Sequence, residues 1–343
     1  MSYNFYTFFD KNYLYKGIVL YRSLQNTCSD FVLFVLCGDE ITYNLLSKMN
    51  LSNVKLITLQ ELEREDTDLL SIKNTRTHAE YLWTTKASLA LILFKTYPRL
   101  ESLAYLDADL YFFSNPQPLF DELNGDFILI TKSDLSPEYK RLLSQAPYNT
   151  QFIIFKNHPE SIKVLEWWRK KLIERCYGRP SSLLFWRNYK NQNMQGADQI
   201  YLKDWLTRFK GIHVLQNNKL CLGPWNANKY YISLKDNVIY AEDIKLILYH
   251  FHSFEINNAN RFTLVDGAYR INKSVKELIY RPYIAEIKSI LEDIKKLDPN
   301  FHYGIIKKTL KKRMRFFAKR IFYDYYRFLN LFSKNINYKK VDL

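Results

Sequence analysis

Strand-like apolar runs alternate with helical segments through the first third of the chain, and this alternation limits the possible folds most. Asn4–Phe9 is a β-rich run, Tyr13–Leu24 repeats apolar residues at helical spacing, and Phe31–Cys37 is almost wholly apolar. A helix at Ile41–Met49 and a strand at Val54–Thr58 continue the alternation. Such β-α-β units build a mostly parallel sheet flanked by helices, so the sequence predicts a Rossmann-like, mixed α/β fold.

The middle of the chain extends this pattern. A helix capped by Thr84 or Thr85 is expected to end at Pro98. The stretch 178–195 is polar and Asn-rich, which predicts a long loop. The other expected elements are helices at Gln60–Asp66, from Pro137 and at Pro159–Cys176, strands at Leu103–Leu106, Phe127–Thr131 and Gln151–Phe155, and a last clear strand at Leu246–Phe251.

Charge and cysteine content narrow the class of protein. The 343 residues carry a net charge of +15, which favours anionic partners such as nucleotide diphosphates or acidic lipid headgroups. The four cysteines have no zinc-site or disulfide spacing, so a reducing cytoplasm is expected. The N-terminus has no signal-peptide pattern, and no apolar run approaches the roughly 20 residues of a membrane span. Any membrane contact is therefore expected to be peripheral.

Two carboxylates follow the expected strand at Leu103–Leu106. Asp107 and Asp109 are one residue apart, so both reach one ion only if the strand turns out of the sheet there. The carboxyl edge of a parallel sheet is where α/β proteins bind ligands. Carboxylate oxygens suit Mg²⁺ or Mn²⁺, and such an ion stabilises a departing diphosphate. A solvated turn after an edge strand is the alternative interpretation.

The Asp107 segment resembles the DxD motif of nucleotide-sugar glycosyltransferases with the GT-A fold. The opening Phe9–Tyr13, followed by a helix, is similar to the nucleotide-binding motif of glycosyltransferase family 8. This resemblance implies that Asp10, Asn12 and Tyr13 contact the base and ribose of the donor. Without the resemblance, Asp10 and Asn12 would be interpreted as helix-capping residues and Tyr13 as a packing residue.

Two further segments match the family in order. Asn149 and Gln151 stand where the family has an Asn-x-Gly segment lining the sugar pocket, and Gln151 departs from the expected glycine. Asp198 and Gln199 resemble the Asp-Gln pair beside the transferred sugar, which implies a catalytic role for both. The departure at Gln151 leaves the identity of the sugar open.

A late histidine segment completes the resemblance. His250 corresponds to the family's histidine metal ligand. His252 is the alternative candidate for this ligand and is also a candidate to contact the substrate. The family's Lys-Pro-Trp after this histidine is replaced by Ser253–Glu255, so Lys86 is the candidate cation for the diphosphate. Trp225 is expected either to line the acceptor side or to pack in the core.

The C-terminal tail has the pattern of a basic amphipathic helix. Apolar residues recur at helical spacing and lysines and arginines occupy the opposite face, which favours an anionic membrane surface as partner. The alternative is that the stripe packs on the catalytic domain or on a second subunit of a homo-oligomer. The stripe comprises Ile306, Leu310, Met314, Phe317, Ile321, Tyr325, Phe328 and Phe332, and the basic face Lys307, Lys308, Lys311, Lys312, Arg315, Lys319 and Arg320.

Together these features predict a metal-dependent, retaining glycosyltransferase that uses a UDP-sugar with Mn²⁺ or Mg²⁺. The expected acceptor is a glycan or a lipid-linked sugar in bacterial surface polysaccharide synthesis, at the inner face of the cell membrane. The expected division is a catalytic domain at 1–265, with halves at 1–110 and 111–265, and a helical extension at 266–343. The alternative is a non-enzymatic basic protein that binds nucleic acid or membrane. No nucleic-acid motif occurs, so nucleic acid is not an expected partner.

Overall fold

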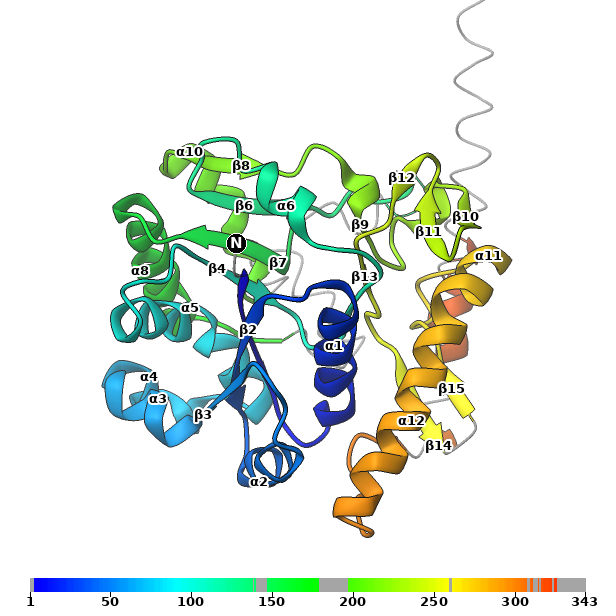
Figure 1. The fold of residues 1–343 in the computed structure, drawn as a ribbon, viewed down its shortest axis with the longest axis horizontal. Coiled ribbons are helices and arrows are strands. Elements are labelled where there is room, and N and C mark those ends of the chain that lie inside the picture. The colour runs from blue at the N-terminus through cyan, green and yellow to red at the C-terminus, as the bar shows by residue number, and fades with distance from the viewer. Residues whose placement is uncertain are drawn as a thin grey trace, which may run out of the picture.

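A seven-stranded sheet forms the centre of the computed structural model, which describes residues 3–137, 139, 147–178, 197–258, 261–306, 309–310, 314, 316–322 and 324–325. The strands are β1 (Tyr3–Phe9), β2 (Phe31–Cys37), β3 (Val54–Thr58), β4 (Ser102–Leu106), β6 (Ile128–Lys132), β7 (Tyr148–Lys156) and β8 (Ile212–Val214). Their order is β3-β2-β1-β4-β7-β6-β8 (Figure 1). Only β7 pairs antiparallel with its neighbours, β4 and β6. The predicted mostly parallel sheet is confirmed.

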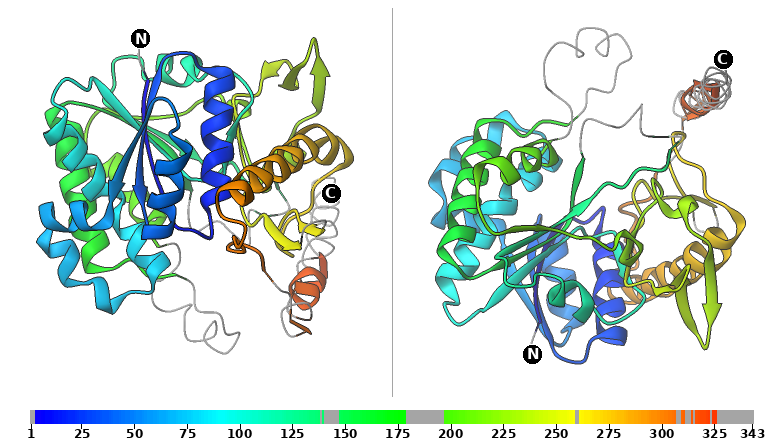
Figure 2. Two further views of the ribbon diagram at one scale, coloured as in Figure 1. Left: turned by 60° about the horizontal axis from the view of Figure 1, so that its bottom comes forward. Right: turned by 90° about the horizontal axis from the view of Figure 1, so that it is seen from above.

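Helices cover both faces of this sheet. The helices α1 (Leu14–Thr27) and α2 (Glu40–Met49) lie on one face, and α5 (His78–Thr96) and α8 (Pro159–Glu174) lie on the other (Figure 2). Successive side chains of a strand point to opposite faces of the sheet. Phe5 therefore packs in the cluster with α1, while Tyr6 packs in the cluster with α5. Both side chains are fully buried. The sheet is therefore a rigid platform whose strand ends present the loops of the site.

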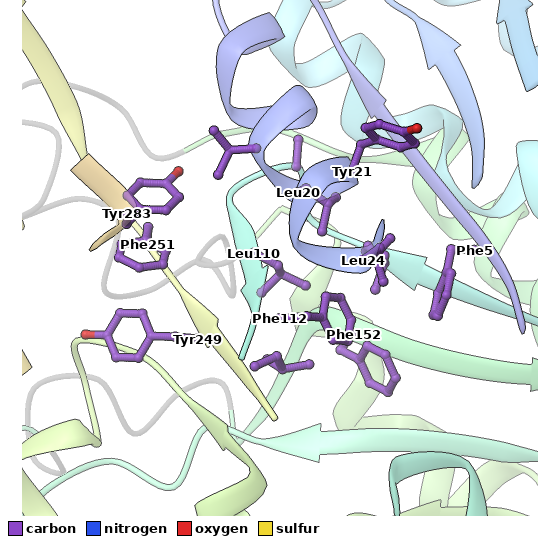
Figure 3. Packing of buried hydrophobic residues seen from close by; sticks show 14 of the residues in the cluster. Phe5, Leu20, Tyr21, Leu24, Leu110, Phe112, Phe152, Tyr249, Phe251 and Tyr283 are labelled. Carbon is purple, nitrogen blue, oxygen red and sulfur yellow. The ribbon is translucent and has the colours of Figure 1, made fainter. Parts of the chain in front are cut away.

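A second, small sheet lies beside α1. It has the order β5-β13-β9, from β5 (Leu110–Phe112), β13 (Leu248–His250) and β9 (Cys221–Leu222). The helix α12 (Arg281–Leu297) follows α11 (Lys273–Val275) and the π-helical turn Lys276–Tyr280, and it packs on α1. In Figure 3, Tyr283 stacks on Phe251, with ring centroids 3.5 Å apart. Val275 to Phe301 thus contribute to the same core as α1, whereas the domain boundary at 265 stays a prediction.

The start of α5 differs from the prediction. The helix begins at His78 and is capped by Thr77, whose hydroxyl accepts from the backbone N–H of Glu80 while the Glu80 carboxylate accepts from the N–H of Thr77. Thr84 and Thr85 instead lie inside the helix and donate their hydroxyls to backbone carbonyls one turn earlier. The capping box is the stronger start signal, and it lies upstream of the apolar residues on which the prediction rested.

The strand predicted at Leu246–Phe251 is present as β13, but it is not the last strand, because two more follow it. The hairpin of β14 (Glu255–Asn258) and β15 (Arg261–Thr263) is short and polar, which hid it from a search for apolar runs. The helix predicted from Pro137 and most of the predicted loop at 178–195 lie outside the described residues. The remaining larger elements are α3 (Leu59–Glu65), α4 (Thr67–Ser71), α6 (Gln117–Asp121), α10 (Trp205–Arg208), β10 (Ile232–Lys235), β11 (Val238–Ala241) and β12 (Ile244–Lys245).

A helix that crosses a membrane must be both long and apolar. None of the helices in the described part of the chain combines the length and the apolarity that crossing a bilayer requires.

Candidate active site

The two aspartates of the DxD motif lie in the turn that joins β4 to β5. The backbone N–H of Leu110 donates to the carbonyl of Asp107 at 3.1 Å, which closes the turn. Each of Asp107, Asp109 and His250 offers a ligand atom, and these three atoms all lie within 4.8 Å of one another. The structure therefore brings the three predicted metal ligands together at the edge of the sheet.

His250 reaches this position through the pairing of β13 with β5. Its backbone stands opposite Leu110, and the N–H of Phe251 donates to the carbonyl of Asp109 at 2.9 Å. The Nε2 of His250 lies 2.8 Å from Oδ1 of Asp109, and its Nδ1 lies 2.8 Å from Oε1 of Gln151. Gln151 belongs to β7, whose carbonyl at this residue accepts from the N–H of Asp107. Three strands thus fix the orientation of one imidazole ring.

The surroundings of the cluster shift the pKa values of its two carboxyl groups in opposite directions. Burial alone would raise the pKa of Asp109, but His250 and Lys16, whose Nζ lies 3.6 Å from Oδ2, lower it below its usual value. Burial raises the pKa of Asp107, against the opposing effects of Lys86 and His250. Burial alone would lower the pKa of His250, but Asp109 and Asp107 raise it. Asp109 is therefore the firmly ionised member of the pair.

This donor set fits a divalent cation. Two carboxylates and an imidazole are ligands that Mn²⁺ accepts readily, and Mg²⁺ takes the carboxylates with water. Without the ion, the two negative charges face each other across the cluster and rely on His250 and the buried lysines for compensation. The predicted metal ligands, Asp107, Asp109 and His250, thus have both the chemistry and the spacing that an ion requires.

A pocket of about 720 Å³ opens beside this cluster, a size that suits a nucleotide-sized ligand. It collects nearly all of the predicted site residues from distant parts of the chain. Gln151 is the exception, because it is almost fully buried behind His250 and is not among the described residues that line the pocket. The predicted residues that line it are Asp10, Asn12, Tyr13, Lys86, Asp107, Asp109, Asn149, Asp198, Gln199, Trp225, His250 and His252.

Lys86 is bound to carboxylates in the wall of the pocket. Its side chain is 2% exposed, it forms an ion pair with Asp198, and its Nζ lies 3.8 Å from Oδ1 of Asp107. The backbone carbonyl of Asp198 accepts from the indole N–H of Trp168, and the amide of Gln199 donates to the carbonyl of Tyr148. The Lys86 charge therefore compensates the buried Asp198 and the partly exposed Asp107, and it orients Asp198 toward the pocket.

The loop after β1 forms another wall. The carboxylate of Asp10 accepts from the backbone N–H and the side-chain amide of Asn12, at 2.9 and 3.0 Å. The helix α1 begins at Leu14 with no side-chain cap bond, so the capping interpretation of this pair was wrong. A second possible metal group, Asp10, Asp39 and His78, lies nearby. The Asp39 oxygens already accept from the backbone N–H groups of Lys11 and Thr42, so Asp39 stabilises the loop after β1 and caps α2.

Aromatic rings line the side of the pocket next to His250. The ring of Trp225 lies 5.4 Å from that of His250 and 6.1 Å from that of His252, edge to face in both cases. Trp225 is 5% exposed, so it is at once a core residue and a pocket wall. The side-chain oxygen of Asn149 accepts from the N–H of Gln151, which holds Asn149 at the pocket surface.

Three site residues escaped prediction from the sequence. Lys16 is buried beside Asp109, although a lysine in a helix is most often solvated. Asp266 and Lys319 line the pocket from the region assigned to the C-terminal extension. The signal for Lys16 was its position within the largely apolar first half of the helix, Leu14–Leu20, whereas Lys319 matched the basic face of the tail equally well.

Sequence comparisons relate this chain to a known family and to two curated proteins. Residues 5–172 match the family described as glycosyl transferase family 8. The uncharacterised protein YfnD of Bacillus subtilis is 30% identical over 309 residues, which cover 90% of this chain and 96% of YfnD. YfnF of the same organism is 29% identical over 306 residues, covering 86% of this chain and 95% of YfnF.

Two solved structures are also similar. The galactosyltransferase LgtC, in complex with donor and acceptor sugar analogues, aligns with a TM-score of 0.44 and 19% identity over 72% of this chain and 86% of LgtC. Mouse xyloside xylosyltransferase 1 aligns with a TM-score of 0.47 and 12% identity over 73% of this chain and 97% of that protein. The family match spans the loop after β1, the DxD turn and the Asn149 segment, and the chain belongs to glycosyltransferase family 8.

Proposed function

We propose that this glycosyltransferase moves a sugar from a nucleotide-diphosphate sugar, with UDP as the favoured carrier, in a reaction that requires Mn²⁺ or Mg²⁺. The observation that carries the proposal is the convergence of Asp107, Asp109 and His250 at the rim of a pocket of nucleotide-sugar size. The non-enzymatic alternative explains neither this cluster nor the family match.

The chemistry follows from which residues line the pocket. Asp10, Asn12 and Tyr13 form the wall for base and ribose, and Asp198 and Gln199 form the wall for the transferred sugar. The bond between the anomeric carbon and the phosphate oxygen breaks, and its electron pair leaves with the diphosphate. A bound divalent cation stabilises that charge. Asn149, Trp225 and His252 contact the sugar and the acceptor.

We further propose that configuration is retained. The acceptor oxygen bonds to the anomeric carbon from the leaving-group side, and its proton passes to the departing phosphate oxygen. Inversion would need a carboxylate base on the opposite side. The carboxylate of Asp134 is held by Lys229 and Tyr230, and Asp134 is not among the described residues that line the pocket. Asp134 is therefore not placed to act as that base, and retention is the outcome that the family resemblance implies.

The test is release of free nucleoside diphosphate from a panel of UDP-, GDP-, dTDP- and ADP-sugars with MnCl₂. We expect one donor class to react, EDTA to stop the reaction, and Asp109→Asn to lower turnover at least about 100-fold. Lys48→Ala, on the exposed face of α2, is the matched control and should react like wild type. A variant Asp109→Asn with full metal-dependent turnover would overturn the proposal.

For the acceptor we propose a glycan or lipid-linked sugar of a surface polysaccharide, met at the cytoplasmic face of the membrane. Three observations support this setting. Within the tail stripe, Leu310, Met314, Phe317, Ile321 and Tyr325 are 60–75% exposed, whereas Ile306 is half-buried. Basic residues accompany them in the sequence, which suits an anionic bilayer surface. All four cysteines are buried thiols, as a reducing compartment allows.

A further inference from the structure

The C-terminal tail forms part of the wall of the donor pocket. Residues 316–322 are helical and pack directly on the backbone of Gly267. A Cβ atom at Gly267 would lie 2.7 Å from the carbonyl oxygen of Phe316 and 3.2 Å from the nitrogen of Arg320. Since both contacts are with backbone, the close approach of this helix requires glycine at position 267.

Two ion pairs hold the helix on either side of this contact. The Nζ of Lys319 lies 2.6 Å from Oδ2 of Asp266, and the guanidinium of Arg270 pairs with Asp324. Lys319 and Asp266 both line the pocket, next to Tyr269, whose ring lies 6.2 Å from that of His252. The Lys319 side chain therefore enters the pocket on the side of the metal cluster.

The wall of the pocket carries more acidic than basic side chains. The described residues that line it include five aspartates, Asp10, Asp107, Asp109, Asp198 and Asp266, but two lysines, Lys86 and Lys319. Lys86 is buried and paired with Asp198. Lys319 is 43% exposed, so its ammonium group can exchange a contact with Asp266 for one with a ligand. The Lys-Pro-Trp sequence of the family, which would supply a lysine after His250, is absent here.

We infer that Lys319 is the cation that contacts the diphosphate of the donor, and that Asp266 positions it. This inference rests on the proposed function, since it assigns a residue to the leaving group of that reaction. Lys319 of the C-terminal tail thus provides the positive charge that the absent Lys-Pro-Trp sequence would have provided. The same helix carries the exposed apolar stripe, so the residue that binds the leaving group belongs to the segment proposed to meet the membrane.

Binding of nucleotides with and without the second phosphate tests the role of Lys319. UDP, GDP, ADP, CDP and dTDP are titrated into the full-length protein with MnCl₂, and the tightest binder is compared with its monophosphate. We expect Lys319→Ala to weaken diphosphate binding roughly five- to twentyfold and monophosphate binding less than about twofold, because a charge-assisted hydrogen bond is lost. Lys319→Arg should restore most of the affinity.

Two further variants separate this role from a general effect. Lys295→Ala removes an exposed lysine of α12 that does not line the pocket, and it should bind both nucleotides like wild type. Gly267→Ala should displace the helix and reproduce the loss of diphosphate affinity with Lys319 intact. Its thermal unfolding under the same conditions shows whether the domain remains folded.

The outcomes distinguish the two proposals. If the wild-type protein binds none of the nucleoside diphosphates, the proposed function fails and this inference with it. If the wild type binds a diphosphate and Lys319→Ala binds it equally well, or loses the monophosphate to the same extent, only the role of Lys319 is overturned.

Discussion

Oε1 of Gln151 lies 2.8 Å from Nδ1 of His250, at the position where a glycine was expected from family resemblance. An amide oxygen accepts a hydrogen bond, so this contact places the imidazole proton on Nδ1. Nε2 lies 2.8 Å from the carboxylate of Asp109 and donates to it when no metal is bound; a metal ion at this site would displace that proton and take the Nε2 lone pair. Gln151, in place of the expected glycine, therefore fills the space behind His250 and leaves Nε2 to face the aspartates.

Replacing Gln151 with methionine should weaken the metal site. Gln151→Met keeps the side-chain volume but removes the acceptor, and we expect Mn²⁺ affinity to fall by about 10- to 100-fold. Gln151→Glu should stay within a few-fold of wild type, because a carboxylate also accepts from Nδ1. Electron paramagnetic resonance of free Mn²⁺, with UDP present, measures both affinities. Equal Mn²⁺ binding by Gln151→Met and wild type would refute the positioning role.

Lys16 should stabilise the protein mainly when the metal is absent. Its Nζ lies 3.6 Å from Asp109 and its side chain is 2% exposed, so Lys16→Met leaves a buried carboxylate with less compensation. We expect a loss of about 2 kcal/mol in the free energy of unfolding without metal. Saturating Mn²⁺ and UDP should recover much of this loss, since the ion supplies the missing positive charge.

Chemical denaturation with and without Mn²⁺ measures this effect. Lys48→Met on the exposed face of α2 is the control and should match wild type in both conditions. A Lys16→Met protein that is as stable as wild type without metal would show that His250 alone compensates Asp109.

The ion pair between Asp66 and Arg169 should make stability depend on pH. Asp66 is 4% exposed; burial alone would raise its pKa, but hydrogen bonds from Arg169 and from the N–H of Leu69 lower it below the usual value. A lowered folded-state pKa contributes stability above the unfolded-state value of about 4, and this contribution disappears as the pH falls through the folded-state pKa. We expect Arg169→Met to cost about 2 kcal/mol at neutral pH.

Urea unfolding of both proteins across the acid range checks the direction of this pH dependence. The difference between wild type and Arg169→Met should shrink below about pH 4, because Asp66 becomes protonated in both proteins. A difference that stays constant from neutral pH to pH 3 would contradict the assignment to Asp66.

The sheet and the grouping of Asp107, Asp109 and His250 were predictable from the sequence and its motifs. Strands such as Phe31–Cys37 are buried on both faces and are therefore apolar throughout, and the turn at Asp107 follows directly from the end of a buried strand. His250 was found through its family motif, although 141 residues separate it from Asp109 in the chain. Local pattern and motif order sufficed for these residues.

Other features depend on contacts between distant segments that no local pattern records. The burial of Lys16 depends on the arrival of Asp109 from the turn after β4. The place of Lys319 in the pocket depends on Gly267, which lets a helix approach its backbone. Gln151 was predicted to contact the substrate, but its side chain is buried behind His250 and hydrogen-bonds to the imidazole ring. Such side-chain positions follow from the assembled fold.

The exposed stripe of the tail helix should decide membrane binding. Phe317 and Ile321 are 60% and 69% exposed and do not line the pocket, so replacing both with serine should leave the fold and nucleotide binding unchanged. We expect wild type to pellet with phosphatidylglycerol-containing vesicles but not with phosphatidylcholine alone, and high salt to release it. The double variant should stay in the supernatant, because it loses the apolar contribution that holds the helix at the interface.

The control is Leu234→Ser, which changes an apolar residue on β10 that is 51% exposed and should pellet like wild type. Sedimentation velocity without lipid tests the competing occupant, a second copy of the chain. If wild type is a dimer, the double variant is a monomer and both pellet equally with vesicles, then the stripe is a subunit interface and the membrane proposal fails. A wild-type monomer that loses vesicle binding on double substitution would instead place the lipid surface at the helix that carries Lys319, beside the donor pocket.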